Sequence, residues 1–144
     1  MGYVYLATRD GSNKISLNGY NHLTWRYKMI PLIRTDNCTD MSNMFLGANY
    51  SLPETLDLRA FNTSHVTTMH SMFDNCKSET ILGLDNFNTA NVTDMAFMFN
   101  ASKATELDLS NFNTSHVTDM ENMSCNCDVE DLDISNFDTS LVTN

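Results

Sequence analysis

Residues 107–120, LDLSNFNTSHVTDM, are one copy of a pattern that recurs along most of this 144-residue chain. The end of the pattern, Val-Thr-x-Met, is found at residues 66–69, 92–95 and 117–120. The phenylalanine of the pattern recurs at Phe61, Phe87, Phe112 and Phe137, at intervals of 26, 25 and 25 residues. Two sets of matches that keep the same spacing indicate a repeat fold, in which each copy is one structural unit.

Each unit contains three local signals. A Leu-x-Leu segment alternates apolar and polar positions, as in a half-buried strand, and occurs at residues 56–58, 82–84, 107–109 and 132–134 (where the last residue is Ile). An Asn-Thr or Asp-Thr pair after each phenylalanine predicts a turn. Met95, Met98 and Phe99 then stand at i, i+3 and i+4, which predicts one face of a short helix. Thr67, Thr93 and Thr118 are placed to be the N-caps of such helices.

No single unit could bury its own apolar residues, so we expect the units to stack and share one core. The predicted fold class is an α/β repeat solenoid, a right-handed coil with short parallel strands on one face and short helices on the other. The methionines of the expected helices, beside Phe45, Phe73 and Phe99, are predicted to be core residues rather than a binding groove.

The pattern at residues 107–120, with Met-Phe three residues after its Met in other units, resembles the BspA-like leucine-rich repeats of bacterial surface proteins. The resemblance covers roughly residues 37–144, although the last unit has Met123-Ser124 in place of Met-Phe. It implies a leucine-rich-repeat-like solenoid used for adhesion and binding. It also implies the cell surface if an export signal lies outside this sequence, whereas a complete chain, lacking a signal-peptide pattern, would be cytoplasmic.

The chain divides into two parts by its repeats. Residues 37–144 hold four to four-and-a-half units. Residues 1–36 do not fit the pattern and are predicted to be an N-terminal cap, with a β-hairpin of residues 3–6 and 14–17 followed by an aromatic segment. The sequence stops inside a new unit at residues 142–144, so either the array continues in a longer protein or the open end supports self-association.

Composition excludes several classes of function. The net charge of −10 argues against direct binding to nucleic acid, which requires clustered Lys and Arg. No run approaches the roughly 20 apolar residues that a membrane span needs. The charge is also uneven, because residues 1–36 hold five Lys or Arg against two Asp or Glu, whereas residues 37–144 hold three against 16.

No pattern predicts catalysis, a metal site or a cofactor, so the chain is not expected to be an enzyme. Cys76 and Cys127 share one repeat position with small residues, which favours buried structural thiols over metal ligands. His65 and His116 share a turn position but stand two units apart, roughly 10 Å if strands stack, which is too far for one metal ion.

The outward positions of the expected strands are rich in charge. The candidate binding residues there are Asp57, Arg59, Asp85, Glu106, Asp108, Asp131 and Asp133. A solvated face kept soluble by its charge is one interpretation. The other is a non-catalytic protein-binding or adhesion module whose acidic face attracts a partner with a basic surface. The alternative function is a small acidic intracellular inhibitor, for example phage-encoded, that mimics nucleic acid and blocks a basic site on a host enzyme.

Overall fold

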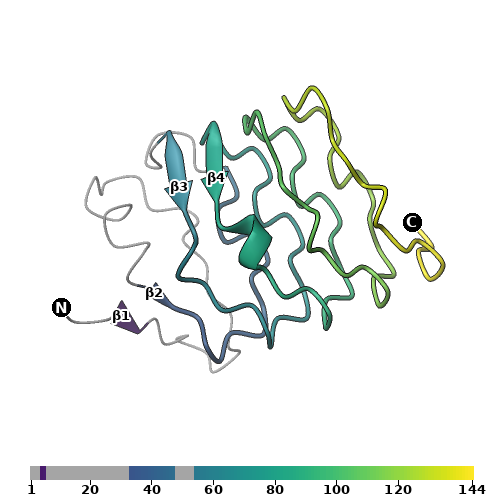
Figure 1. Cartoon of the computed structure of the whole chain (residues 1–144), viewed down its shortest axis with the longest axis horizontal. Helices are drawn as coiled ribbons and strands as arrows, with labels where there is room; N and C mark the ends of the chain where they lie inside the picture. The colour runs from purple at the N-terminus through teal and green to yellow at the C-terminus, as the bar shows by residue number, and fades with distance from the viewer. Residues whose placement is uncertain (1–3, 6–32, 48–53) are drawn as a thin grey trace.

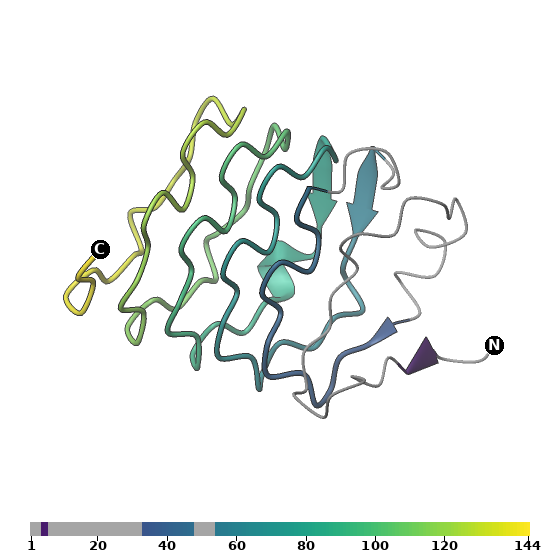
Figure 2. The same ribbon diagram turned by 180° about the vertical axis from the view of Figure 1, so that it is seen from behind.

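The computed structural model describes residues 4–5, 33–47 and 54–144. From Ile33 to the C-terminus, successive units lie side by side along the longest axis of the molecule (Figure 1). Each unit runs along one side of the molecule and returns along the other, as the reverse view shows (Figure 2). Segments about 25 residues apart in sequence are therefore neighbours in space, and their apolar side chains meet between the two sides.

The described strands are short and pair in parallel. Strand β1 (Val4–Tyr5) pairs with β2 (Ile33–Arg34), and β3 (Thr55–Asp57) pairs with β4 (Thr80–Leu82). The chain then forms a single 3-10 turn, η2 (Leu84–Asn86). The predicted N-terminal cap and its hairpin lie largely outside the described residues.

The predicted strand alignment is wrong by one residue in the second repeat. Leu56 pairs with Ile81 rather than with Leu82, and Leu82 is 37% exposed. Leu58 and Leu84 are both buried, so one extra residue has been accommodated between β4 and Leu84. That residue is Gly83, whose φ of 95° lies in the left-handed region that favours glycine.

Strands are also absent where the third and fourth repeats were predicted to have them, at residues 107–109 and 132–134. An extra residue interrupts a strand ladder, as the one at Gly83 does after β4. The following units are joined on this side by scattered hydrogen bonds instead. The Thr105 N–H donates to the Glu79 carbonyl (3.0 Å), and the Asn136 Nδ2 donates to the Leu109 carbonyl (3.2 Å).

The predicted short helices are not formed, and the described residues contain no α-helix. The segments concerned, here called ladder segments, are residues 41–47, 69–75, 95–101 and 120–126. In the first three ladder segments, every second N–H donates to the next unit rather than to the carbonyl four residues earlier. Phe73, for example, donates to Met98, and Phe99 donates to Met123 (2.8 and 2.7 Å). A two-turn helix would be marginal on its own, whereas these bonds are supported by stacking.

Local turns between these bonds explain why the helical spacing of the apolar residues led to a wrong prediction of short helices. The Met98 N–H bonds to the Met95 carbonyl (3.2 Å) across a turn whose third residue, Phe97, has a φ of 57°. A positive φ at that position is typical of a type II turn and ends any right-handed helix. The turn still directs Met95, Met98 and Phe99 to the interior. Because no helix begins there, the predicted N-cap role of the threonines is also wrong.

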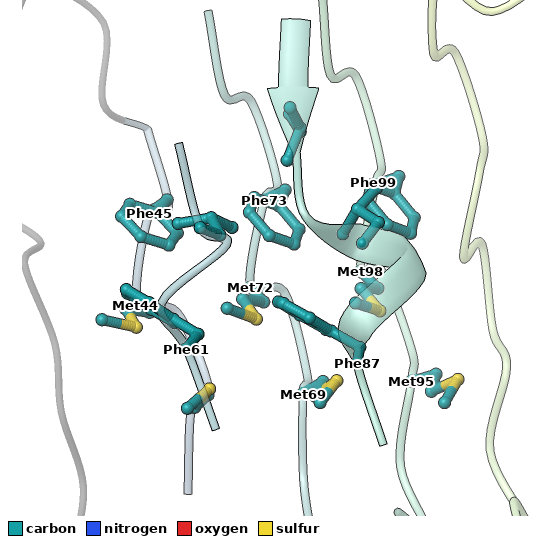
Figure 3. Close-up of a cluster of buried hydrophobic side chains, with 14 of the residues drawn as sticks. Met44, Phe45, Phe61, Met69, Met72, Phe73, Phe87, Met95, Met98 and Phe99 are labelled. Atoms are coloured by element: carbon teal, nitrogen blue, oxygen red, sulfur yellow. The ribbon is translucent and has the colours of Figure 1, made fainter. Parts of the chain in front are cut away.

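The core is built from the same side chains in each unit. The prediction that the ladder methionines are core residues is confirmed for six that have no exposed surface: Met41, Met44, Met69, Met72, Met95 and Met98. Phe45, Phe73 and Phe99 stack along the axis with ring centroids 5.5 and 5.2 Å apart (Figure 3). The interplanar angles of 9° and 3° show that the rings lie nearly parallel from unit to unit.

A row of threonines, most of them buried, joins neighbouring units by hydrogen bonds. Its members, here called the threonine row, are Thr35, Thr63, Thr89 and Thr114, with Thr139 at the same position in the last unit. The Thr89 Oγ1 donates to the Asn113 carbonyl (3.0 Å) and accepts the Asn113 N–H (2.8 Å). The other three buried threonines make the same pair of bonds, which fixes how neighbouring units align.

Candidate protein-interaction surface

The candidate binding residues lie on the side of the molecule that carries β3 and β4, here called the strand face. Asp57 is half-buried. The others are exposed: Arg59, Asp85, Glu106, Asp108, Asp131 and Asp133. The structure therefore leaves six of the seven predicted side chains accessible to a partner, but it distributes their charge unequally along the stack.

The first half of the strand face is less acidic than the second. The Arg59 guanidinium contacts the Asp57 carboxylate at 2.7 Å, and its side-chain hydrogen bonds lower the pKa of Asp57. An exposed pair of this kind adds little stability, but it cancels one of the carboxylates. In the next unit β4 places Leu82 in register with Asp57, so an apolar side chain follows the ion pair. Asp85, in η2, is the remaining predicted carboxylate here.

The second half of the strand face is strongly acidic. Its predicted carboxylates are Glu106, Asp108, Asp131 and Asp133, and all are exposed. No Lys or Arg follows Lys103 in the sequence, whereas nine Asp or Glu do. Lys103 itself forms an ion pair with Asp128 (2.8 Å). Among the described residues, Glu106, Asp108, Asp131 and Asp133 form no ion pair with a Lys or Arg.

Two of these carboxylates also hold local turns. Asp108 accepts the Ser110 hydroxyl (2.6 Å) and the Ser110 N–H (3.1 Å), and Asp133 accepts the Ser135 N–H (2.9 Å). These bonds, the serine hydroxyl first, lower the pKa of Asp108 and of Asp133. Both groups consequently stay ionised to lower pH than an ordinary aspartate. The bonds also give each side chain a structural role that any test of binding has to separate from its charge.

In the part of the chain that the structure describes, the cysteine and histidine side chains do not gather into a metal site. The four cysteines are free thiols, with Cys38 and Cys76 buried, Cys125 exposed and Cys127 half-buried. Burial raises the pKa of the Cys76 thiol, whereas Cys127, which directly follows the last ladder segment, is less covered than predicted. Within residues 33–47 and 54–144, no three His, Cys, Asp or Glu side chains are grouped to hold a metal ion. The histidines His65 and His116 are exposed turn residues.

The prediction from sequence missed Leu82 as an outward side chain, since the Leu-x-Leu alignment placed it inside. Along the sequence, Leu82 precedes Phe87 by as many residues as Leu56 precedes Phe61, and this equal spacing conceals the extra residue. The available signal was the spacing of Thr55 and Thr80, which is 25 residues rather than 26. No helix in the described part of the chain is long and apolar enough to cross a membrane.

Comparison with known proteins identifies the family of the repeats but not their activity. Residues 39–144 match a family described as Mycoplasma protein of unknown function, DUF285. That family is related to the BspA-like repeat proteins. No curated protein and no solved structure matches the chain.

Proposed function

Because the chain belongs to the DUF285 family of Mycoplasma proteins of unknown function, over residues 39–144, we propose that it is a non-catalytic protein-binding module. Its repeats would form a solenoid of the leucine-rich-repeat type, with the strand face as the contact surface. The relation of the family to BspA-like repeats supports a role in binding or adhesion. The side-by-side arrangement of the units is consistent with an extended surface of that kind (Figure 1).

The observation that carries the proposal is the unpaired negative charge on the last two units of the strand face. Glu106, Asp108, Asp131 and Asp133 are exposed, and the lowered pKa values of Asp108 and Asp133 keep these two groups ionised in mildly acidic solution. Such a field attracts a positively charged partner at long range and weakens as salt is added. The partner we propose is therefore a protein with a basic surface.

The exposed Leu82 adds an apolar contact beside the charges. It lies in β4, between the Asp57–Arg59 pair and the acidic second half of the face. Charged contacts at the rim of an interface mainly set the association rate, whereas a desolvated apolar anchor supplies affinity. A partner that combines Lys or Arg with an apolar side chain would use both features.

The test uses a lysine-rich peptide as a probe of the acidic half. We expect Asp108→Asn with Asp133→Asn to weaken binding about tenfold, because two exposed charge contacts are each worth up to about 1 kcal/mol. Asparagine keeps an oxygen that can accept the turn hydrogen bonds, so the fold is retained. Fluorescence anisotropy at two salt concentrations measures the effect, and circular dichroism checks the fold.

The matched control removes the same charge elsewhere. Asp138 is exposed and holds a turn through the Ser140 N–H (2.9 Å), and the three preceding units have asparagine at its position. The control is therefore the double variant Asp138→Asn with Glu121→Gln. It removes two charges, as the test variant does, and should weaken binding by less than about threefold. Equal losses in the two double variants would show that net charge alone matters and would contradict the strand face as the site. If a natural basic partner is found, its release by duplex DNA would instead favour nucleic-acid mimicry.

A further inference from the structure

One aromatic side chain of the ladder segments lies partly in solvent. Phe97 is half-buried, whereas Phe99, two residues later, has no exposed surface. The φ of Phe97, 57°, lies in the left-handed region, which is rare for a bulky residue. The first and last ladder segments have asparagine at this position, Asn43 and Asn122, which adopts such angles more readily. Backbone conformations of this kind concentrate at binding sites, so Phe97 is a candidate for a role outside the core.

An oriented histidine lies beside this ring. The ring centroids of His70 and Phe97 are 5.8 Å apart, with an interplanar angle of 59°. The His70 Nδ1 lies 3.3 Å from the Asp94 carboxylate, which also accepts the Ala96 N–H (2.9 Å). Because a carboxylate only accepts hydrogen bonds, Nδ1 carries the hydrogen, and Nε2 of the neutral ring is left as an acceptor. The side chains of His70 and Asp94 are 40% and 35% exposed, so a partner can reach both.

The surroundings of Phe97, His70 and Asp94, here called the Phe97 patch, are negatively charged. The Phe97 N–H donates to the carbonyl of Glu121 in the next unit (2.8 Å), and the side chain of Glu121 is exposed. Asp94 is joined by a parallel bridge to Asp119, two residues before Glu121. The four ladder segments contain no Lys or Arg. The patch therefore presents an aromatic ring, an imidazole acceptor and carboxylates, without a Lys or Arg of its own.

A guanidinium group complements all of these features. It is planar, has N–H donors but no acceptor, and stacks on aromatic rings, whereas an ammonium is a compact and strongly hydrated charge. We propose that the Phe97 patch binds an arginine side chain of a protein partner. The guanidinium stacks on the Phe97 ring and donates to the Asp94 carboxylate and to the His70 Nε2. The ladder segments run along the side of the molecule opposite the strand face, so this contact is separate from the one proposed above (Figures 1 and 2).

Two peptides of equal length and charge, one rich in arginine and one rich in lysine, test the patch. At about pH 8 histidine side chains are ordinarily neutral. There we expect Phe97→Asn to weaken binding of the arginine peptide about fivefold and that of the lysine peptide less than about twofold. Fluorescence anisotropy measures the four affinities. Asparagine already has this position in two other units, so the fold should be retained, as circular dichroism can verify.

Phe97→Tyr is the matched control, because it keeps the aromatic ring. It should bind each peptide within about twofold of the unmodified protein. The double variant Asp108→Asn with Asp133→Asn should instead weaken both peptides by a similar factor, so that failure of the strand face and failure of the Phe97 patch are distinguishable. Equal losses of the two peptides in Phe97→Asn, an unchanged affinity for the arginine peptide, or an equally large loss in Phe97→Tyr would each overturn the proposal.

Discussion

At the residue scale, single threonines link neighbouring units by hydrogen bonds. In each buried member of the threonine row, one hydroxyl donates to a carbonyl of the next unit and accepts an N–H from the same residue. The hydroxyl thereby satisfies two backbone groups of the next unit in a partly buried environment. Burying such groups unpaired is more costly than a single hydrogen bond is favourable.

Replacing Thr89 by valine tests this role. Valine keeps the shape but leaves the Asn113 N–H and carbonyl without their bonds of 2.8 and 3.0 Å. We expect the free energy of unfolding to fall by about 1–3 kcal/mol, as measured by urea denaturation. The same change at Thr139, which is exposed at the end of the row, should be close to neutral. Equal losses at the two positions would show that the cross-unit bonds are not the cause.

Gly83 sets the strand register, and a methyl group there would not fit. A Cβ at Gly83 would lie 2.6 Å from the Arg59 backbone nitrogen, in addition to the strain of a φ of 95°. We expect Gly83→Ala to destabilise the fold by about 2–5 kcal/mol in thermal or urea unfolding. Gly47→Ala is the comparison, because its φ is +58° but the space around it is open. Its expected loss is about 1 kcal/mol, and a similar loss at Gly83 would argue against the close contact.

At the element scale, the sequence predicted which residues are buried better than it predicted the backbone that buries them. Met95, Met98 and Phe99 are interior as expected, but in a ladder segment of turns rather than in a helix. The helical spacing and a turn with a positive φ direct the same three side chains inward. The choice between them depends on carbonyls of the next unit, such as Met123, which local periodicity does not describe.

The phenylalanine stack is the packing element that these segments share. Phe73 is fully buried between Phe45 and Phe99, so its removal should leave a cavity and break two ring contacts. We expect Phe73→Ala to lower the free energy of unfolding by about 3–5 kcal/mol. Phe97→Asn is the contrast, since Phe97 is half-buried with a positive φ that asparagine tolerates and should change stability by less than about 1 kcal/mol. Comparable losses would mean that the stack has no special role.

At the scale of the whole molecule, the uneven charge follows directly from the sequence, but its place on the surface does not. The exposure of Glu106, Asp108, Asp131 and Asp133 agrees with their predicted outward positions. The weaker negative charge of the first half depends on the Asp57–Arg59 contact and on the outward Leu82. The outward Leu82 results from a one-residue register change that a repeat alignment conceals, whereas the Asp57–Arg59 contact is local to the first unit.

A stack of units should also be unequal in stability along its length. Central units are bonded on both sides, for example Phe97, which donates to the Glu121 carbonyl (2.8 Å). The last unit is bonded on one side, through Thr143 to the Thr118 carbonyl (2.9 Å). Local opening needs less free energy where fewer apolar contacts are broken. We therefore expect amide hydrogen exchange at Thr143 to be at least about tenfold faster than at Phe97 in dilute solution.

Comparing two regions of the chain tests this gradient. Residues 131–144 should exchange faster than the segment around Phe97, which is bonded to units on both sides. Mass spectrometry of peptides from the two regions measures both rates in one experiment. Uniform exchange along the stack would contradict independent opening of the units, because each unit would then open only when the whole molecule unfolds.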